Sequence, residues 1–202
     1  EAAFWISHRG QLRNSVAAGH FEALAQVSAV DARIVGNTFA STEPSDDVVA
    51  FRIGDSQGLL VANNLIDLTA ATTSGVRTMA SLDDAYPAPD GIEAPSAEIF
   101  RHNFLYGANG LTLGDGDYVY EPTSVVLIDH GNCVAGDLVP PAQQCDSDVP
   151  GFAGSTGFDF RLGDAAEAID EGDDSYVRDG ERDLLGGARV QGDDVDVGAY
   201  ER

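Results

Sequence analysis

The stretch ARIVGNTF, residues 32–39, carries the pattern from which the fold is predicted. A short β-prone run, Ala32–Val35, precedes Asn37, and the apolar residue Phe39 follows two positions after the asparagine. The same order of asparagine, any residue and an apolar residue recurs at Asn14, Asn64, Asn103 and Asn132. Repetition at intervals of roughly 20 to 40 residues is typical of solenoids, in which each turn repeats one structural unit.

Short β-prone runs precede most of these asparagines and also lie between them. Before the asparagines we expect strands at Ala32–Val35, Leu59–Val61, Ala97–Phe100 and Val125–Ile128. Between them we expect a second class of strand, at Val48–Ile53 and Gly110–Leu113, each followed by a turn rich in glycine and aspartate. Within residues 17–28, Phe21, Leu24 and Ala25 share one helical face, which predicts a short helix or helical detour.

The recurring asparagines have a physical reason to stand at the bends between strands. After glycine, asparagine is the residue that best tolerates the left-handed backbone region that a sharp bend requires. An inward-pointing amide can also bond to the equivalent amide one turn away. We therefore expect a ladder of Asn14, Asn37, Asn64, Asn103 and Asn132, the alternative being that asparagine is merely a common turn residue.

A second set of motifs lies at the end of the chain. Residues 168–172 read AIDEG, residues 183–190 read DLLGGARV, and residues 195–201 read VDVGAYE. These motifs resemble the closing segment of right-handed parallel β-helix proteins of the pectate-lyase-like superfamily, including its Val-Asp-Ile-Gly-Ala-Tyr-Glu ending. The resemblance covers residues 158–201 closely and residues 30–201 loosely, with Ala166-Glu167 standing where Ser-Pro is usual.

The resemblance implies an all-β fold, namely a right-handed parallel β-helix solenoid of about six or seven rungs with a C-terminal cap. Residues 1–157 would form the rungs, with an insertion loop at about 79–96, and residues 158–202 would close the same domain. In the closing segment we expect Asp170 to be structural. We also expect Arg189 to pair with Asp196, Asp183 or Glu201 over the open end of the coil.

The charge of the chain excludes several classes of partner. Aspartate and glutamate number 34 against 11 basic residues, all of them arginine, which gives a net charge of −23. Nucleic-acid backbones and anionic membranes require a basic surface, so neither is an expected partner. No run of apolar residues is long enough for a transmembrane helix, so membrane insertion is not expected. Acidity without lysine suits a protein that stays soluble outside the cell, either secreted or on the cell surface.

The two cysteines and the start of the chain add two further expectations. Cys133 and Cys145 predict a disulfide that closes a short loop and suits an extracellular setting, the alternative being two unrelated thiols. The chain opens on the strand-like residues 4–6 without a capping motif. An uncapped first rung leaves three alternatives: upstream residues of a larger secreted protein, a partner chain, or self-association.

Catalytic motifs of the resembled superfamily find little support in this chain. The absence of lysine excludes lysine-based polysaccharide lyases, and the Gly-His-Gly and Arg-x-Lys elements of the galacturonases are missing. The remaining candidates are Asp83, Asp84, Arg101, His102 and His130, for which roles in turns and ladder edges are the alternative. We therefore expect a non-catalytic structural or adhesive module that recognises carbohydrate through the aromatic residues Trp5, Tyr86, Tyr106, Tyr118 and Tyr120, for some of which core packing is the alternative. A polysaccharide lyase or glycoside hydrolase is the alternative.

Calcium is the one cofactor that the residue types favour. Hard oxygen ligands lie beside glycine turns at Asp115, Asp117, Glu121, Asp179 and Asp183. Neither stretch matches an EF-hand loop or the nonapeptide calcium repeat, so solvated turn carboxylates are the alternative.

Overall fold

The computed structural model describes residues 2–19, 23–42, 48–53, 58–70, 77–82, 98–106, 126–128, 133–134, 143–144, 149–154 and 158–202. Within these residues the protein is all-β, without an α-helix, and its one helical element is the 3-10 turn η1 (Asp174–Tyr176). In the same part of the chain, no helix has the length and apolar character needed to cross a membrane.

The described strands form three sheets in which neighbouring strands run parallel. Sheet A contains, in order, β1 (Ala2–Ile6), β4 (Ala23–Val27), β7 (Val48–Ile53) and β10 (Arg77–Leu82). Sheet B contains β13 (Val126–Ile128), β11 (Glu98–Arg101), β8 (Leu60–Ala62), β5 (Arg33–Val35) and β2 (Gln11–Arg13). Sheet C contains β15 (Gln143–Gln144), β14 (Cys133–Val134), β12 (Phe104–Tyr106), β9 (Leu65–Asp67), β6 (Thr38–Ser41) and β3 (Val16–Gly19).

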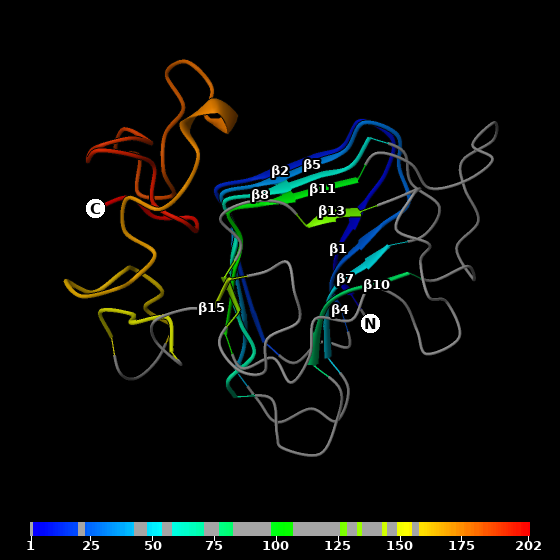
Figure 1. Ribbon diagram of the computed structural model, residues 1–202, viewed down its shortest axis with the longest axis horizontal. Coiled ribbons are helices and arrows are strands. Elements are labelled where there is room, and N and C mark those ends of the chain that lie inside the picture. Colours follow the sequence, from blue (N-terminus) through cyan, green and yellow to red (C-terminus); the bar gives the residue numbers. More distant parts are fainter. Residues whose placement is uncertain are drawn as a thin grey trace.

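From β1 to β12 the chain visits sheets A, B and C in turn, and each cycle adds one strand to every sheet (Figure 1). The remaining described strands extend sheet B by β13 and sheet C by β14 and β15. Strand β4 pairs with β1 and β7, β5 with β2 and β8, and β6 with β3 and β9. Strands one cycle apart in the sequence are therefore neighbours in space. Side chains at equivalent positions consequently stack in rows along the coil.

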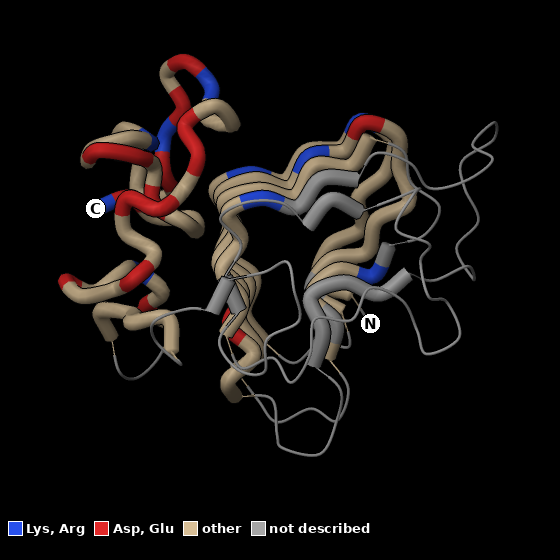
Figure 2. The backbone as a smooth tube through the Cα atoms, viewed as in Figure 1, with Lys and Arg blue, Asp and Glu red and all other residues tan. Residues whose placement is uncertain are grey.

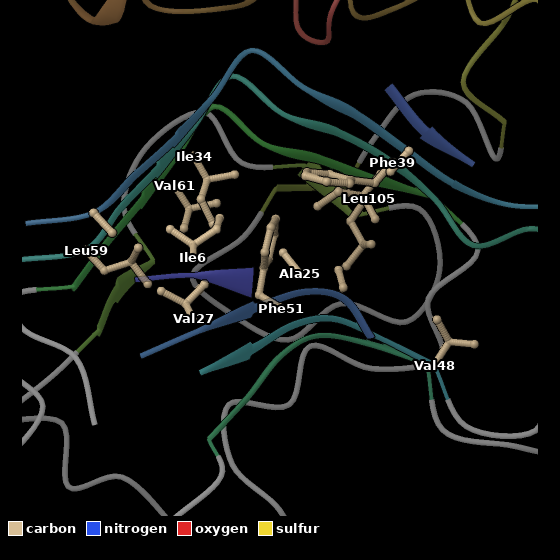
Figure 3. Close-up of a cluster of buried hydrophobic side chains, with 14 of the residues drawn as sticks. Ile6, Ala25, Val27, Ile34, Phe39, Val48, Phe51, Leu59, Val61 and Leu105 are labelled. Carbon is tan, nitrogen blue, oxygen red and sulfur yellow. The ribbon is translucent and has the colours of Figure 1, made fainter. Parts of the chain in front are cut away.

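The inner rows of all three sheets meet in one apolar core (Figure 3). Sheet B contributes Ile34 beside Val61, and sheet C contributes Phe39 in the row that also holds Leu105. The ring of Phe39 meets that of Phe51 from sheet A in a T-shaped contact, with centroids 5.5 Å apart. The core thus joins successive turns, because a single turn has too few apolar residues to bury its own inner face.

Two-residue bends join sheet B to sheet C. The first residue of each bend has a left-handed backbone, with φ of 47° at Asn14, 65° at Gly36, 54° at Asn63 and 49° at His102. The second residue, at Ser15, Asn37, Asn64 and Asn103, precedes the strand of sheet C. The prediction that the ladder asparagine itself adopts the left-handed region is therefore wrong at Asn37, Asn64 and Asn103, where the preceding residue does so.

The register also corrects the predicted position of Asn14. Arg13 pairs with Val35 and Val16 with Thr38, so Asn14 is equivalent to Gly36, and Ser15 is equivalent to Asn37. The prediction of a helix within residues 17–28 is wrong as well, because β3 and β4 occupy the described part of that stretch. Strand β4 pairs on both sides, with β1 and β7, and this pairing outweighs the local helical pattern.

The predicted strand at Val48–Ile53 coincides with β7, and the four strands predicted before asparagines agree with β5, β8, β11 and β13 to within one residue. The predicted strand at 110–113 and most of the predicted insertion loop at 79–96 lie outside the described residues.

Residues 158–202, here called the C-terminal segment, lie beside the coil at the bends between sheets B and C (Figure 1). Their contacts reach Asn14, Thr38, Asn63 and His102, which belong to four successive turns. The expectation of a cap over the open end is corrected accordingly, since the described contacts run along the side of the stack. Aspartate and glutamate are concentrated in this segment (Figure 2).

Candidate functional site

Buried asparagines form a continuous ladder at the bends between sheets B and C. Nδ2 of Asn37 donates to Oδ1 of Asn64 at 2.9 Å, and Nδ2 of Asn64 donates to Oδ1 of Asn103 at 2.8 Å. Each of these oxygens also accepts the backbone N–H of the asparagine that donates to it. The ladder continues to the first turn, where the N–H of Ser15 donates to Oδ1 of Asn37. Asn132 lies outside the described residues.

Asn14 binds the C-terminal segment instead of the ladder. Its Nδ2 donates to Oε1 of Glu181 at 2.8 Å and to the carbonyl of Arg182 at 2.9 Å. Its Oδ1 accepts a hydrogen bond from Nε of Arg189 at 3.0 Å. The side chain that sequence reasoning placed in the ladder therefore connects the first turn to the end of the chain.

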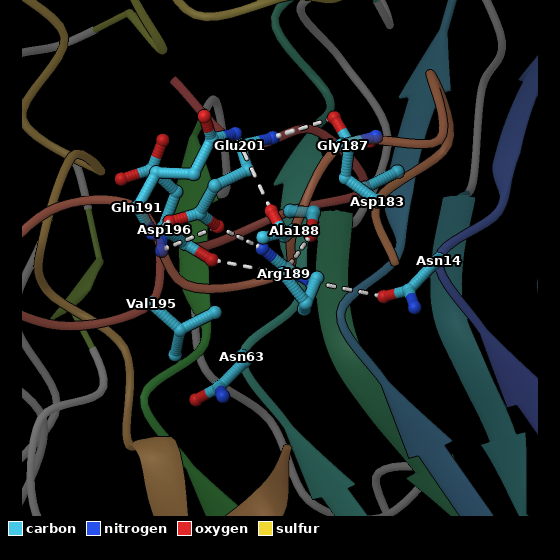
Figure 4. Close-up of polar contacts among 12 residues, drawn as sticks. Asn14, Asn63, Asp183, Gly187, Ala188, Arg189, Gln191, Val195, Asp196 and Glu201 are labelled. Carbon is cyan, nitrogen blue, oxygen red and sulfur yellow. Dashed lines mark hydrogen bonds and ion pairs between the residues drawn. The ribbon is translucent and has the colours of Figure 1, made fainter. Parts of the chain in front are cut away.

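Arg189 is the centre of a buried polar cluster (Figure 4). Its side chain is 2% exposed, forms an ion pair with Glu201, and donates to the carbonyls of Asp196 and Gly198. Of the three carboxylates predicted as partners, only that of Glu201 pairs with the guanidinium directly. Burial is the main reason why the pKa of Arg189 is lowered, and the carboxylates of Glu201 and Asp196 oppose that shift.

The other acidic residues of the closing motifs hold backbone amides in place. Asp183 accepts from the N–H groups of Gly187 and Glu201, and Asp196 accepts from the N–H of Asp170 at 2.9 Å. Asp170 itself has a left-handed backbone, with φ of 55°, and accepts from the N–H of Asp193. These contacts fix the path of the C-terminal segment and direct the three carboxylates at peptide groups.

Two glutamates of the cluster have pKa values shifted in opposite directions. Burial, helped by the nearby Asp196 carboxylate, raises the pKa of Glu201 to about 7, and Arg189 opposes the shift. Burial would also raise the pKa of Glu181, but hydrogen bonds from the Arg178 amide and the Arg13 and Asn14 side chains outweigh it, so the pKa is lowered. Arg13 and Glu181 approach to 2.8 Å in a largely buried ion pair that sequence reasoning missed.

Two of the candidate catalytic residues also contact the C-terminal segment. Nη1 of Arg101 donates to the hydroxyl of Tyr176 at 3.3 Å, and Nδ1 of His102 lies 3.0 Å from the carbonyl oxygen of Glu171. These two neighbours thus face the segment that covers the bend. Asp83, Asp84 and His130 lie outside the described residues.

The predicted calcium ligands and cysteines fall largely outside the described residues, as Asp115, Asp117, Glu121 and Cys145 all do. Cys133 lies in β14, and the predicted disulfide stays a prediction. Across the part of the chain that the structure describes, no three histidine, cysteine, aspartate or glutamate side chains gather as a metal site. There Asp179 is exposed, and Asp183 accepts the two amides noted above.

Sheet A carries a row of outward-facing residues that sequence reasoning did not assemble. The register places Trp5 beside Gln26 and Gln26 beside Arg52, on strands β1, β4 and β7. Their neighbours in the strands, such as Ile6 and Phe51, point into the core. Side chains alternate between the faces of a strand, so the row lies on the outer face of sheet A. Gln26, between Trp5 and Arg52, is itself buried at 3% exposed. In the sequence, Trp5 and Arg52 each stand between two apolar residues, and this pattern is the signal that could have identified them as outward-facing.

The row combines chemical groups that suit a flat polar ligand. The indole of Trp5 is 68% exposed, and Arg52 is partly exposed. An exposed indole offers an apolar face, and a guanidinium offers several N–H donors in one plane. In comparisons with known proteins, no family model, curated protein or solved structure matches this chain.

Proposed function

We propose that this chain is a right-handed parallel β-helix of about six or seven rungs that acts outside the cell as a structural or adhesive module. Residues 1–157 form the rungs in this proposal, and residues 158–202 form the closing segment of the same domain. The cyclic order of the three parallel sheets and the motifs at the chain end support it. Its target is carbohydrate, bound along the outer face of sheet A.

The observation that carries the carbohydrate proposal is the placement of Trp5 and the partly exposed Arg52 on the outer face of sheet A, with the buried Gln26 between them. Neighbouring strands in a sheet are about 4.8 Å apart, so the strands that carry Trp5 and Arg52 are separated by about 10 Å along the coil. A polysaccharide chain lying along this face would stack a sugar face on the Trp5 ring and place hydroxyls near the guanidinium of Arg52. Neutral or weakly charged polysaccharides suit the net charge of −23 best.

A role without catalysis is supported by the positions of the candidate residues. Arg101 and His102 face the C-terminal segment, away from sheet A, and Arg52 is the one charged member of the described part of the outward row. General acid–base cleavage requires positioned proton donors and acceptors at the scissile bond. We therefore expect no unsaturated or reducing-end products when polysaccharides are incubated with the protein.

The test compares two exposed aromatic residues in a panel of soluble polysaccharides, with affinity electrophoresis as the readout. Trp5 is 68% exposed on sheet A, and Phe158 is 73% exposed in the C-terminal segment. Trp5→Ala is expected to weaken binding about tenfold or more, whereas Phe158→Ala leaves it unchanged. Equal affinities of wild type and Trp5→Ala for every polysaccharide, or release of products by wild type, would contradict the proposal.

The first turn provides the second part of the proposal. In the described part of the chain, β1, β2 and β3 are the outermost strands of their sheets at one end of the coil. Edge strands present backbone groups for further parallel pairing, so a second copy or a partner strand is proposed to pair there. Native mass spectrometry over a range of protein concentrations tests self-association directly, and a monomer throughout would exclude the second copy.

A further inference from the structure

An open cleft of about 310 Å³ lies in the C-terminal part of the chain. Its polar lining comes from Arg161, Asp164, Tyr200, Glu201 and Arg202, and Leu185 forms part of its apolar wall. None of these residues belongs to sheet A, so the cleft is separate from the outward row. Its volume is at the lower end of the range of about 300 to 1,000 Å³ that is usual for small-molecule sites.

The charges around the cleft cancel in pairs. Arg161 binds Asp159 with two parallel hydrogen bonds, Nε to Oδ1 at 2.8 Å and Nη2 to Oδ2 at 2.6 Å. Arg202 pairs with Asp164, and Glu201 is bound by the buried Arg189. An anionic ligand would have to compete with these carboxylates for the arginines. The cleft therefore favours a neutral ligand.

The polar pairs and the apolar wall together define the kind of neutral ligand. A guanidinium has five N–H donors, and Arg161 uses two of them to bind Asp159. A carboxylate can likewise accept more hydrogen bonds than a single partner donates, so both kinds of group have capacity left for a ligand. Leu185 is 67% exposed, and the ring of Tyr200 is partly exposed beside it in the lining. A sugar ring matches this set, because its hydroxyls both donate and accept while its C–H faces pack on apolar and aromatic groups.

The walls of the cleft are held in place by backbone hydrogen bonds. On one side, the N–H of Ala153 donates to the carbonyl of Arg161 at 2.8 Å, and the N–H of Gly163 donates to that of Gly151 at 2.9 Å. A Cβ on Gly163 would lie 2.8 Å from the Gly151 oxygen, so a larger residue would separate these two segments. A site that is formed before binding loses less entropy when the ligand arrives.

We propose that this cleft binds one neutral sugar unit, as a site separate from the face of sheet A. The inference extends the proposed recognition of carbohydrate to a second position, but it depends on no residue of sheet A. A chain end or a branch sugar fits such a cleft better than the interior of a long polymer, because the cleft is compact. The predicted affinity is in the millimolar range that is expected for a single sugar in a small, open site.

The experiment uses saturation-transfer NMR with methyl glycosides of glucose, galactose and mannose, and with galacturonate as the anionic counterpart. At least one neutral glycoside is expected to bind the wild type more tightly than galacturonate does. Leu185→Ser removes the apolar contact and is expected to weaken binding about fivefold. Leu184→Ser is the matched control, because Leu184 is 45% exposed next to Leu185 but does not line the cleft, and binding should not change.

A second variant tests the balance of charge. Asp164→Asn leaves Arg202 without its carboxylate partner. Asp164 is exposed, so the variant is expected to fold as wild type does, which circular dichroism checks. Galacturonate is expected to gain affinity relative to the neutral glycosides in this variant. Trp5→Ala should leave glycoside binding unchanged even where it abolishes polysaccharide binding, so failure of the sheet A proposal and failure of the cleft are distinguished.

The cleft proposal is overturned if no neutral glycoside binds, if Leu184→Ser and Leu185→Ser weaken binding equally, or if Trp5→Ala removes glycoside binding. Tighter binding of galacturonate than of every neutral glycoside by the wild type would also overturn it, since the cancelled charges could not then be what selects the ligand.

Discussion

Each bend between sheets B and C makes two different demands on single residues. The first position requires a left-handed backbone, and the second requires a side chain that reaches the next turn. Asparagine meets both demands, which is why Asn63 and Asn64 can stand side by side in different roles. Asn63 meets the first demand and also binds the backbone of Asp173 in the C-terminal segment through its amide.

The middle of the ladder is where an amide contributes most. Asn64 donates to Asn103 and to the carbonyl of Ile34, and it accepts twice from Asn37. Asn64→Ala leaves these buried partners unsatisfied and should lower the free energy of unfolding by about 3 kcal/mol or more. Urea denaturation measures the loss. Ser15→Ala, which removes only a hydroxyl bonded to the carbonyl of Arg13, should cost less than about 1 kcal/mol, and equal losses would contradict the ladder's role.

Glu201 gives the cluster around Arg189 a dependence on pH. Its pKa is raised to about 7 in the folded protein, so the native state binds the proton more tightly than the unfolded chain does. The stability that this difference contributes is fully present below about pH 4.5 and is lost as the pH rises through 7, by up to about 3 kcal/mol.

Glu201→Gln removes the titrating carboxyl group. The difference in stability between the variant and wild type therefore reports on Glu201 separately from the other carboxylates. The stability of the variant relative to wild type should therefore improve as the pH rises from 4.5 to 8, which thermal melts at a series of pH values measure. A difference between the two proteins that stays constant, or that changes in the opposite direction, would show that burial does not govern Glu201.

At the scale of elements, the local sequence predicted those strands whose own residues are β-prone and are bounded by turn signals. Strand β7 was predicted with its observed bounds because six β-prone residues stand between clear turn signals. Strand β4 was missed because Leu24 and Ala25 also fit a helical face, and only pairing with β1 and β7 decides between the two structures. Asn14 was assigned one position out of register because the residues around it satisfy the same short pattern as Asn37.

The glycine of the AIDEG motif allows the C-terminal segment to pass close to its own end. A Cβ on Gly172 would lie 2.6 Å from both Cγ1 and the carbonyl oxygen of Val195. Gly172→Ala is therefore expected to destabilise the protein by about 2 to 3 kcal/mol, because a backbone atom cannot move aside as a flexible side chain does. Thermal or urea unfolding measures this loss.

Gly180→Ala provides the control for that substitution. A Cβ at Gly180 meets no atom within 4 Å, and only its left-handed backbone, with φ of 71°, opposes alanine, at a cost of about 1 kcal/mol. If Gly172→Ala were no more destabilising than Gly180→Ala, the close approach to Val195 would not limit this position.

A calcium site at Asp115, Asp117 and Glu121 stays a prediction, which a chelator tests. If Asp115, Asp117 and Glu121 bind Ca²⁺, EDTA should lower the melting temperature by several degrees, because a ligand of the native state is removed. The double variant Asp115→Asn, Asp117→Asn should then melt at the lower temperature with or without EDTA, and Asp179→Asn should respond as wild type does. A melt that EDTA does not change would exclude structural calcium.

At the scale of the whole molecule, two apolar contacts and a set of polar contacts hold the C-terminal segment against the coil. Leu65 and Phe104, on the outer side of sheet C, pack with Leu162 and Val197, and Tyr176 packs against sheet B. The Arg13–Glu181 pair lies at the same contact. The acidic segment thus meets arginines of the coil, which places part of the charge of −23 in a structural role.

The sequence predicted which residues of the closing motifs are structural more readily than it predicted the surface they cover. The motif predicts that Arg189 pairs with Asp196, Asp183 or Glu201, because a buried charge must be paired, and the structure selects Glu201. The coil surface they meet depends on Asn14, Thr38 and Asn63, which belong to different turns and come together only after the strands have stacked. The sequence marks Trp5 and Arg52 singly as outward-facing, but they lie two cycles apart, so only the stacking of the strands places them on one face.

Trp5 permits the most direct test of the central claim, because it is the single tryptophan of the chain and lies in the outward row of sheet A. Its fluorescence reports on that face alone. We predict that a polysaccharide bound by the protein protects Trp5 from quenching by acrylamide, with a saturable dependence on polysaccharide concentration. Quenching that stays unchanged while the polysaccharide is shown to be bound would contradict recognition on sheet A.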